Sequence, residues 1–226
     1  MNVRYWLSDS IYGINDGLAA IFGIIAGVSG FGASRQFILV SGMFGVIASG
    51  LSMAAGAWLA AKSENELVDN VRRQQHLAHD EHPEEQLALL GGHFTELGFS
   101  DDEAGWISKK IADKPDNVVR LLLIMEHGFQ SDHRKRPLDS AIFGGVSTWI
   151  GGMIPLFPLL FVSGVQGFWL AAIVSIVAHF VVGAAKSKLT GRLWWAGGLE
   201  MMFAGILVGL AAYGLGAAGS KLFMKL

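Results

Sequence analysis

The chain has 226 residues, of which 52% are hydrophobic and only 16% are charged, and its mean hydropathy is +0.44. Soluble domains carry about 25% charged residues, so this composition indicates a membrane protein. The net charge of −2 argues against a nucleic-acid partner, the apolar content excludes intrinsic disorder, and the absence of cysteine excludes disulfides, iron–sulfur clusters and thiolate zinc sites.

The charged residues are concentrated in one stretch, residues 62–137. It holds ten of the 17 Lys and Arg residues, fifteen of the 19 Asp and Glu residues and six of the seven histidines. The remainder is apolar enough for five membrane-spanning helices of about 20 residues each. We expect these spans at residues 14–33, 37–61, 141–165, 167–185 and 193–218, after an amphipathic lead-in at 1–13. The sequence therefore predicts an all-α membrane protein in three parts: 1–61 with two spans, an inserted helical domain at 62–137, and 138–226 with three spans.

The insert carries helix signals throughout and no strand pattern. We expect a helix over 63–80, a second that begins at Pro83, a third opened by a Ser100–Glu103 capping box, and a fourth from Pro115 to about Gln130. Three to four short amphipathic helices of this kind make a small bundle beside the membrane.

Basic residues indicate the orientation, because cytoplasmic loops carry an excess of Lys and Arg. With five spans, the N-terminus, the insert and the 186–192 loop share one side. That side carries Arg4, Lys62, the basic run 134–136, Lys186, Lys188 and Arg192, whereas the other carries Arg35, Lys221 and Lys225. We place the N-terminus and the insert in the cytoplasm and the C-terminus outside. Asp9 and Asp16 would interrupt the apolar run of a signal peptide, so we expect no cleaved signal peptide. The compact chain without targeting signals favours a bacterial inner membrane.

Three side chains in the first two spans are candidates for an ion path. Asp16 lies where the first span enters the bilayer, where an ionisable group is costly and marks an ion path or proton relay. Asp9 lies two helical turns earlier on the same face. Met53, in the second span, has a thioether that can bind soft or borderline metals. The alternatives are an interfacial Asp that reaches water, and a methionine that only packs.

Six neighbouring residues of the insert form a second candidate site. His76, His79 and Asp80 share one helical face, and His82, Glu84 and Glu85 follow across Pro83. Imidazole and carboxylate ligands suit iron, manganese, zinc or cobalt. Met125 and Glu126 are further possible ligands, as are His93 and Glu96. The alternative is a solvated acidic helix end.

Two further ionisable residues lie in apolar spans, His179 in the fourth and Glu200 in the fifth. Either can relay protons or can form a helix–helix hydrogen bond. The pairs Gly13/Gly17 and Gly23/Gly27 predict close helix contact, which a dimer partner could also supply. Hydrolase, ATPase and zincin motifs are absent from the sequence, so we expect no enzyme.

Several stretches of the chain resemble the vacuolar iron transporter family, as in a bacterial-type member. Residues 12–18, 22–30, 48–56 and 60–64 look like its first two helices, 82–85, 98–100 and 125–126 like its cytoplasmic metal-binding domain, and 151–158 like its third helix. The resemblance implies a homodimer with five spans per chain, which exports ferrous iron, and often manganese, in exchange for protons. It assigns Asp9, Asp16 and Met53 to the ion path at the dimer interface, and Glu84, Glu85 and Glu126 to metal collection. Iron, or manganese, zinc or cobalt, is then the transported ion, and no tightly bound cofactor is expected.

The chain departs from this family at several positions. Gly45 stands where the family has a glutamate, two turns before the methionine. Gln74, Gln75, His76, His79 and Gln130 stand where cytoplasmic glutamates are expected. Two other classes therefore stay open. One is a membrane metal sensor that binds without transport, and the other is a structural membrane protein or a transporter of a different cation.

Overall fold

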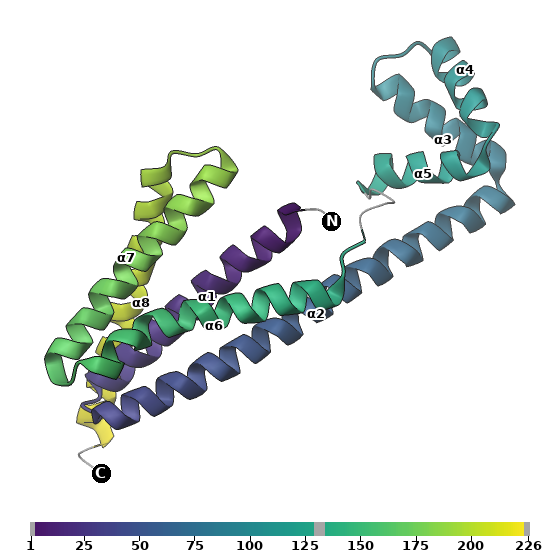
Figure 1. Ribbon diagram of the computed structural model, residues 1–226. Coiled ribbons are helices and arrows are strands. Elements are labelled where there is room, and N and C mark those ends of the chain that lie inside the picture. The colour runs from purple at the N-terminus through teal and green to yellow at the C-terminus, as the bar shows by residue number, and fades with distance from the viewer. Residues whose placement is uncertain (1–2, 129–133, 224–226) are drawn as a thin grey trace. The chain divides into compact units, whose positions relative to one another are not determined.

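The computed structural model describes residues 3–128 and 134–223, and these residues form eight helices and no strand (Figure 1). In chain order they are α1 (Val3–Gly30), α2 (Arg35–Glu81), α3 (Pro83–Glu96), α4 (Asp101–Ala112), α5 (Pro115–His127), α6 (Pro137–Phe161), α7 (Gly164–Thr190) and α8 (Trp194–Phe223). Five of them, α1, α2, α6, α7 and α8, are long and apolar enough to cross a membrane. The predicted all-α class and the five apolar spans are confirmed.

The chain divides into two compact units. One comprises Met1–Leu59 with Pro137–Leu226, and the other comprises Ala60–Arg136. Helix α2 contributes to both, so the predicted second span and the predicted helix at 63–80 are one continuous helix. The reason is local: residues 57–81 contain neither glycine nor proline, and nothing in the backbone stops the helix where its composition changes from apolar to polar.

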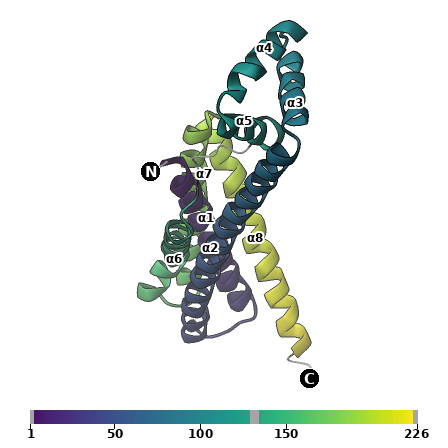
Figure 2. The same ribbon diagram turned by 90° about the vertical axis from the view of Figure 1, so that its right-hand side faces the viewer.

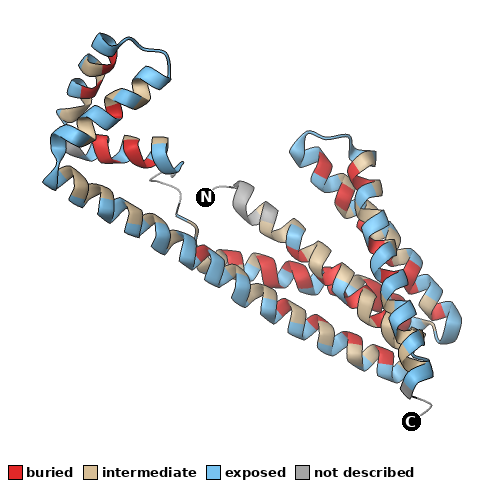
Figure 3. Cartoon of the chain, turned by 180° about the vertical axis from the view of Figure 1, so that it is seen from behind, coloured by how far each residue is buried: buried red, intermediate tan, exposed pale blue. Residues whose placement is uncertain are grey.

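In the first unit, α1 is the central helix. It packs against α6, α7 and α8, and α7 also packs against α6 and α8. The buried core joins Ile21 and Ile25 of α1 to Val46 of α2, Leu156 of α6 and Ala171 of α7. Figure 3 shows buried positions gathered where α1 and α6 meet, with exposed positions along α8. This packing holds the polar residues of α1 against fixed neighbours.

Glycines let α1 approach its neighbours at backbone distance. A Cβ at Gly13 would lie 2.6 Å from the carbonyl oxygen of Gly144, and one at Gly17 would overlap the carbonyl oxygen of Thr148, both on α6. Gly23 and Gly27 instead face Val208 and Ala212 of α8. Both glycine pairs thus mark close helix contacts, as predicted, and the partner helices belong to the same chain.

Arg35, the first residue of α2, caps the end of α6. Its Nε donates to the carbonyl oxygen of Leu159 at 2.9 Å and its Nη2 to that of Leu160 at 2.8 Å. The last carbonyls of a helix have no partner within the helix, and a cation stabilises this end of the helix dipole. Arg35 therefore fastens the start of α2 to the end of α6.

Arg35→Gln is expected to lower the thermal stability of the purified protein in detergent. Hydrogen bonds from a charged donor contribute about 1.5–3 kcal/mol, and the partial exposure of Arg35 places the loss near the lower end. Arg35→Lys keeps the charge but not the two-pronged geometry, and we expect an intermediate melting temperature. If Arg35→Gln melts with the wild type, the cap contributes nothing.

In the second unit, α3 and α5 pack around Leu90, Val118 and Leu122, and α4 packs against both helices (Figure 2). Pro83 opens α3, as predicted. The capping box at α4 is also confirmed: Glu103 accepts hydrogen bonds from the backbone N–H (2.9 Å) and hydroxyl (2.8 Å) of Ser100. The predicted extension of the last helix to about Gln130 is wrong, because Gly128 adopts a left-handed conformation (φ 69°) and α5 ends at His127. Gln130 itself lies outside the described residues.

The capping box makes the start of α4 sensitive to acid. The backbone N–H of Ser100, and then its hydroxyl, hold the pKa of Glu103 below its ordinary value of 4.5. A carboxyl group whose pKa is lowered by folding stabilises the fold when the pH is above its ordinary pKa. This contribution is lost as the pH falls through the lowered pKa. We expect amide exchange in residues 101–104, corrected for intrinsic rates, to accelerate below pH 4.5. Glu103→Gln should show no such step, and an equal step in that variant would contradict the assignment.

Candidate functional site

The first candidate site lies where α1 meets α2. Asp16 on α1 is partly buried, and the hydroxyl of Ser49 on α2 donates to its Oδ2 at 3.3 Å. A hydroxyl donor orients a carboxylate and leaves its other oxygen available for a ligand. This contact joins the two helices across a sequence separation of 33 residues.

Met53 follows Ser49 by one helical turn on α2. Its side chain packs on α6, where a Cβ placed at Gly144 would lie 3.4 Å from the Met53 Cγ and 3.8 Å from its Sδ. Since α1 and α2 are joined only by residues 31–34, they run antiparallel. Met53 and Asp9 therefore lie on the same side of the Asp16–Ser49 contact. Along the helix axes, Met53 lies about 6 Å from Ser49 and Asp9 lies about 10 Å from Asp16. The backbones of the predicted path residues thus lie on one side of the Asp16–Ser49 contact, while the Met53 side chain packs on α6.

Gly45, one turn before Ser49, faces the interior of the first unit. A Cβ at this position would lie 2.6 Å from Cδ1 of Ile24 and 2.9 Å from Cδ1 of Ile21. Isoleucine methyl groups therefore occupy the space next to the position where the resemblance leads us to expect a carboxylate. The α1–α2 contact is polar at Asp16 and Ser49 and apolar one turn further on.

The second candidate site lies in the Ala60–Arg136 unit, around the carboxylate of Glu126 on α5. Gln75 of α2 donates to its Oε2 at 2.6 Å, and the Nε2 atoms of His93 and His127 lie 3.9 and 3.7 Å from its oxygens. The Nε2 of His93, the Nδ1 of His79 and the Oε1 of Gln75 are buried without a hydrogen-bond partner. Buried polar atoms of this kind normally have a partner, so this unit retains unused ligand capacity.

The other residues predicted to bind metal in this unit are dispersed. His76 lines a polar cavity of about 200 Å³ together with Arg72, Asp116 and Arg120, and the two guanidinium groups disfavour a cation there. Met125 packs against the Leu90 core. The remaining predicted ligands lie exposed at or near the α2–α3 corner, namely Asp80, His82, Glu84 and Glu85. Among the described residues, no three His, Asp or Glu side chains are close enough to hold one metal ion.

His179 and Glu200 occupy different environments in the first unit. His179 is 1% exposed and packs on Gly205 of α8, with its Nδ1 2.8 Å from the carbonyl oxygen of Ser175 and its Nε2 buried without a partner. Glu200 is exposed near the start of α8, 3.3 Å from Arg192. The two residues therefore do not form one relay.

Sequence reasoning does not single out Ser49, and it notes Gln75 only as a glutamine where the resemblance leads us to expect a glutamate. Both are uncharged, and their spacing carries no metal-binding pattern. The available signal was position: Ser49 lies one turn before Met53, and Gln75 lies one turn before His79 on the same helix face.

An apolar unit of long helices that holds a partly buried carboxylate against a hydroxyl of the neighbouring helix has the features of a polytopic membrane transporter. The model of the VIT family matches residues 7–217, so the chain belongs to the VIT family, whose members are transporters and not enzymes.

Named relatives agree with this assignment. The chain is 31% identical over 214 residues to "Vacuolar iron transporter 1" of Oryza sativa subsp. japonica, covering 93% of this chain and 84% of the relative. It is 31% identical over 210 residues to "Vacuolar iron transporter" of Centaurea cyanus (92% and 85% covered), and 29% identical over 220 residues to "Vacuolar iron transporter cccA" of Arthroderma benhamiae (96% and 77%). These relatives come from plants and fungi, so they give no support to a bacterial-type member or a bacterial inner membrane.

Proposed function

We propose that the protein moves ferrous iron, and also manganese, across its membrane in exchange for protons, through a path formed by Asp9, Asp16 and Met53. The observation that carries this proposal is the contact of Asp16 with Ser49, one turn from Met53. We infer that the Met53 thioether, on the next turn of α2, serves the same ion. The names of the relatives support iron as the ion.

The chemistry of Asp16 explains the coupling. A carboxylate must be deprotonated to bind a metal ion, so proton binding and metal binding compete for the same oxygens. Asp16 alternates between the metal-bound and the protonated state, while the Ser49 hydroxyl keeps one oxygen oriented in both. Met53 adds a soft ligand, which suits ferrous iron better than calcium or magnesium.

A homodimer is part of this proposal. Apolar residues recur along α2 at spacings of three and four, and all are substantially exposed: Phe37 (59%), Val40 (53%), Phe44 (68%), Ile47 (46%) and Leu51 (58%). This spacing is that of a helix–helix seam. A second copy packed on this seam would border the α1–α2 contact and complete the coordination of a metal at Asp16 and Met53.

The direction of transport follows from the proposed orientation. The excess of basic residues at the N-terminus, in residues 62–137 and in the 186–192 loop supports a cytoplasmic location for these segments. The Ala60–Arg136 unit then collects metal from the cytoplasm at separate positions, with Glu126 as one ligand and the exposed Glu84 and Glu85 at the α2–α3 corner as others. Protons return through Asp16, and His179 and Glu200 are candidate relays.

A metal sensor without transport is the second candidate. The observation that favours it is Gly45, where Ile21 and Ile24 fill the space next to the expected carboxylate. A site without that carboxylate can bind a metal and still fail to release it across the membrane. This function predicts metal binding without flux.

The test is ferrous-ion uptake into liposomes that hold the purified protein and an internal pH dye, with manganese, zinc and cobalt in parallel. We expect influx of iron and manganese with proton movement in the opposite direction. Protein-free liposomes control for leakage. Metal binding without flux would replace the transporter by the sensor, and Gly45→Glu would then be the variant to assay for restored flux.

A further inference from the structure

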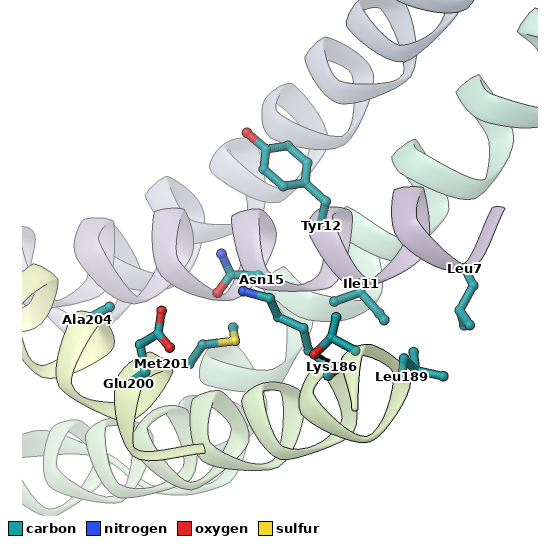
Figure 4. Close-up of a pocket in the computed structure, with 10 residues that line it drawn as sticks. Leu7, Ile11, Tyr12, Asn15, Lys186, Leu189, Glu200, Met201 and Ala204 are labelled. Atoms are coloured by element: carbon teal, nitrogen blue, oxygen red, sulfur yellow. Dashed lines mark hydrogen bonds between the residues drawn. The ribbon is translucent and has the colours of Figure 1, made fainter. Parts of the chain in front are cut away.

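The first unit contains a cavity of about 570 Å³ apart from the proposed metal path through Asp9, Asp16 and Met53 (Figure 4). Residues from α1, α7 and α8 line it. Its wall is mostly apolar, with Ile11, Leu189 and Met201 among the contributors. Five polar side chains also line it: two hydroxyls, an amide, an amine and a carboxylate, from Tyr12, Thr190, Asn15, Lys186 and Glu200. Asn15 neighbours Asp16 in sequence, but Asp16 contacts α2 through Ser49, so the cavity and the ion path lie on different sides of α1.

The polar groups lie at the depth of lipid headgroups. Helix α8 begins with Trp194 and Trp195, which are 52% and 49% exposed, and exposed tryptophans mark the membrane interface. Glu200 lies about 8 Å further along α8, and Lys186 lies about 6 Å before the end of α7. Glu200 and Lys186 therefore both lie near the boundary between headgroups and acyl chains. A lysine side chain at this depth can extend its amine toward the interface.

The cavity is lined by one cationic and one anionic side chain, Lys186 and Glu200. Within the described residues, no carboxylate lies in ion-pair range of Lys186, and Figure 4 shows its amine extended toward Asn15. Glu200 pairs with Arg192 at 3.3 Å, but both side chains are exposed, so this pair is weak. The cavity therefore offers a cation without a carboxylate partner, an amide and an accessible carboxylate.

We propose that this cavity binds a phospholipid whose headgroup carries a phosphate and a primary ammonium, as in phosphatidylethanolamine. The phosphate accepts hydrogen bonds from Lys186 and Asn15, the ammonium donates to Glu200, and the upper part of one acyl chain covers the apolar wall. A choline headgroup cannot donate a hydrogen bond to Glu200, and a glycerol headgroup has no positive charge for it. The volume suits a headgroup with part of a chain. The lipid would fasten α1 to the α7–α8 pair, whichever ion is transported.

The test is native mass spectrometry and thermal denaturation of the full-length protein in detergent, with phosphatidylethanolamine, phosphatidylglycerol and phosphatidylcholine of identical acyl chains. We expect phosphatidylethanolamine to be retained at least severalfold better than the other two and to raise the melting temperature most. Lys186→Gln should reduce retention to the background level. Glu200→Gln should remove the preference for ethanolamine over glycerol headgroups.

Lys188→Gln is the matched control, since Lys188 is an exposed lysine at the same end of α7 that does not line the cavity. It should retain the lipid as the wild type does. The melting temperature without added lipid shows that each variant is folded. Glycerophosphoethanolamine, the headgroup without chains, should stabilise little. Equal retention of the three lipids, equal loss in Lys186→Gln and Lys188→Gln, a preference for phosphatidylglycerol, or full stabilisation by the soluble headgroup would each overturn the proposal.

Discussion

Asp16→Asn is expected to reduce proton-coupled ferrous-ion flux by more than about 100-fold while the protein stays folded. Loss of a residue that only orients a metal ligand costs about 10–100-fold, so loss of the ligand itself should cost more. Asparagine has nearly the same shape, and its carbonyl oxygen can still accept the hydrogen bond from Ser49. The change therefore removes the charge and the titration and leaves the helix contact in place. Liposome flux with an internal pH dye measures both movements.

Two further variants separate the roles around Asp16. Ser49→Ala keeps the carboxylate but removes its donor, and we expect a smaller loss, about 10-fold, with the proton coupling retained. Met53→Leu keeps the volume beside Gly144 and removes the sulfur, so it should change the ranking of iron against manganese more than it changes the total flux. Wild-type flux in Asp16→Asn would exclude Asp16 from the path.

The sequence predicted the helices of this chain better than their ends. Apolar runs of about 20 residues and the capping signals at Pro83 and Ser100 are local, and the structure has helices at each of them. The sequence predicts a span at 37–61 and a separate helix at 63–80 because the composition changes between them, whereas α2 is continuous. Composition indicates whether lipid or water surrounds a helix. The helix itself ends at a local backbone signal, such as a glycine, a proline or a cap.

The partners of the site were less predictable than its members. Asp16 and Met53 stand out because they are unusual in an apolar span, but Ser49 does not. In apolar helices a hydroxyl commonly bonds back to the carbonyl four residues earlier, as Thr148 and Ser175 do here. Ser49 instead bonds to another helix. Whether a serine bonds within its own helix or to a neighbouring one depends on how close the neighbouring helix lies. A single sequence does not give the distance between two helices.

Close helix packing around the path leads to the second large effect. Gly17→Ala is expected to destabilise the folded protein severely. A Cβ at Gly17 would overlap the backbone carbonyl of Thr148 and lie 2.8 Å from the backbone N of Gly152. Backbone atoms cannot move aside as the end of a side chain can, so α1 and α6 would have to separate. In a membrane, helices associate mainly through such contacts, so their loss is not compensated by the hydrophobic effect.

The separation would also affect contacts on both sides of Gly17. Gly13 packs against Gly144 and Gly151 packs against Ile14, in the same α1–α6 contact. We therefore expect a destabilisation of about 3 kcal/mol or more, at the upper end for overpacking, seen as aggregation in size-exclusion chromatography and a lower melting temperature. Gly56→Ala is the control, because nothing lies within 4 Å of a Cβ there. It introduces the same methyl group into a membrane helix and should fold as well as the wild type. If Gly17→Ala behaved like Gly56→Ala, α1 and α6 would be further apart than the structure shows, and the position of Asp16 against Ser49 would no longer depend on their packing.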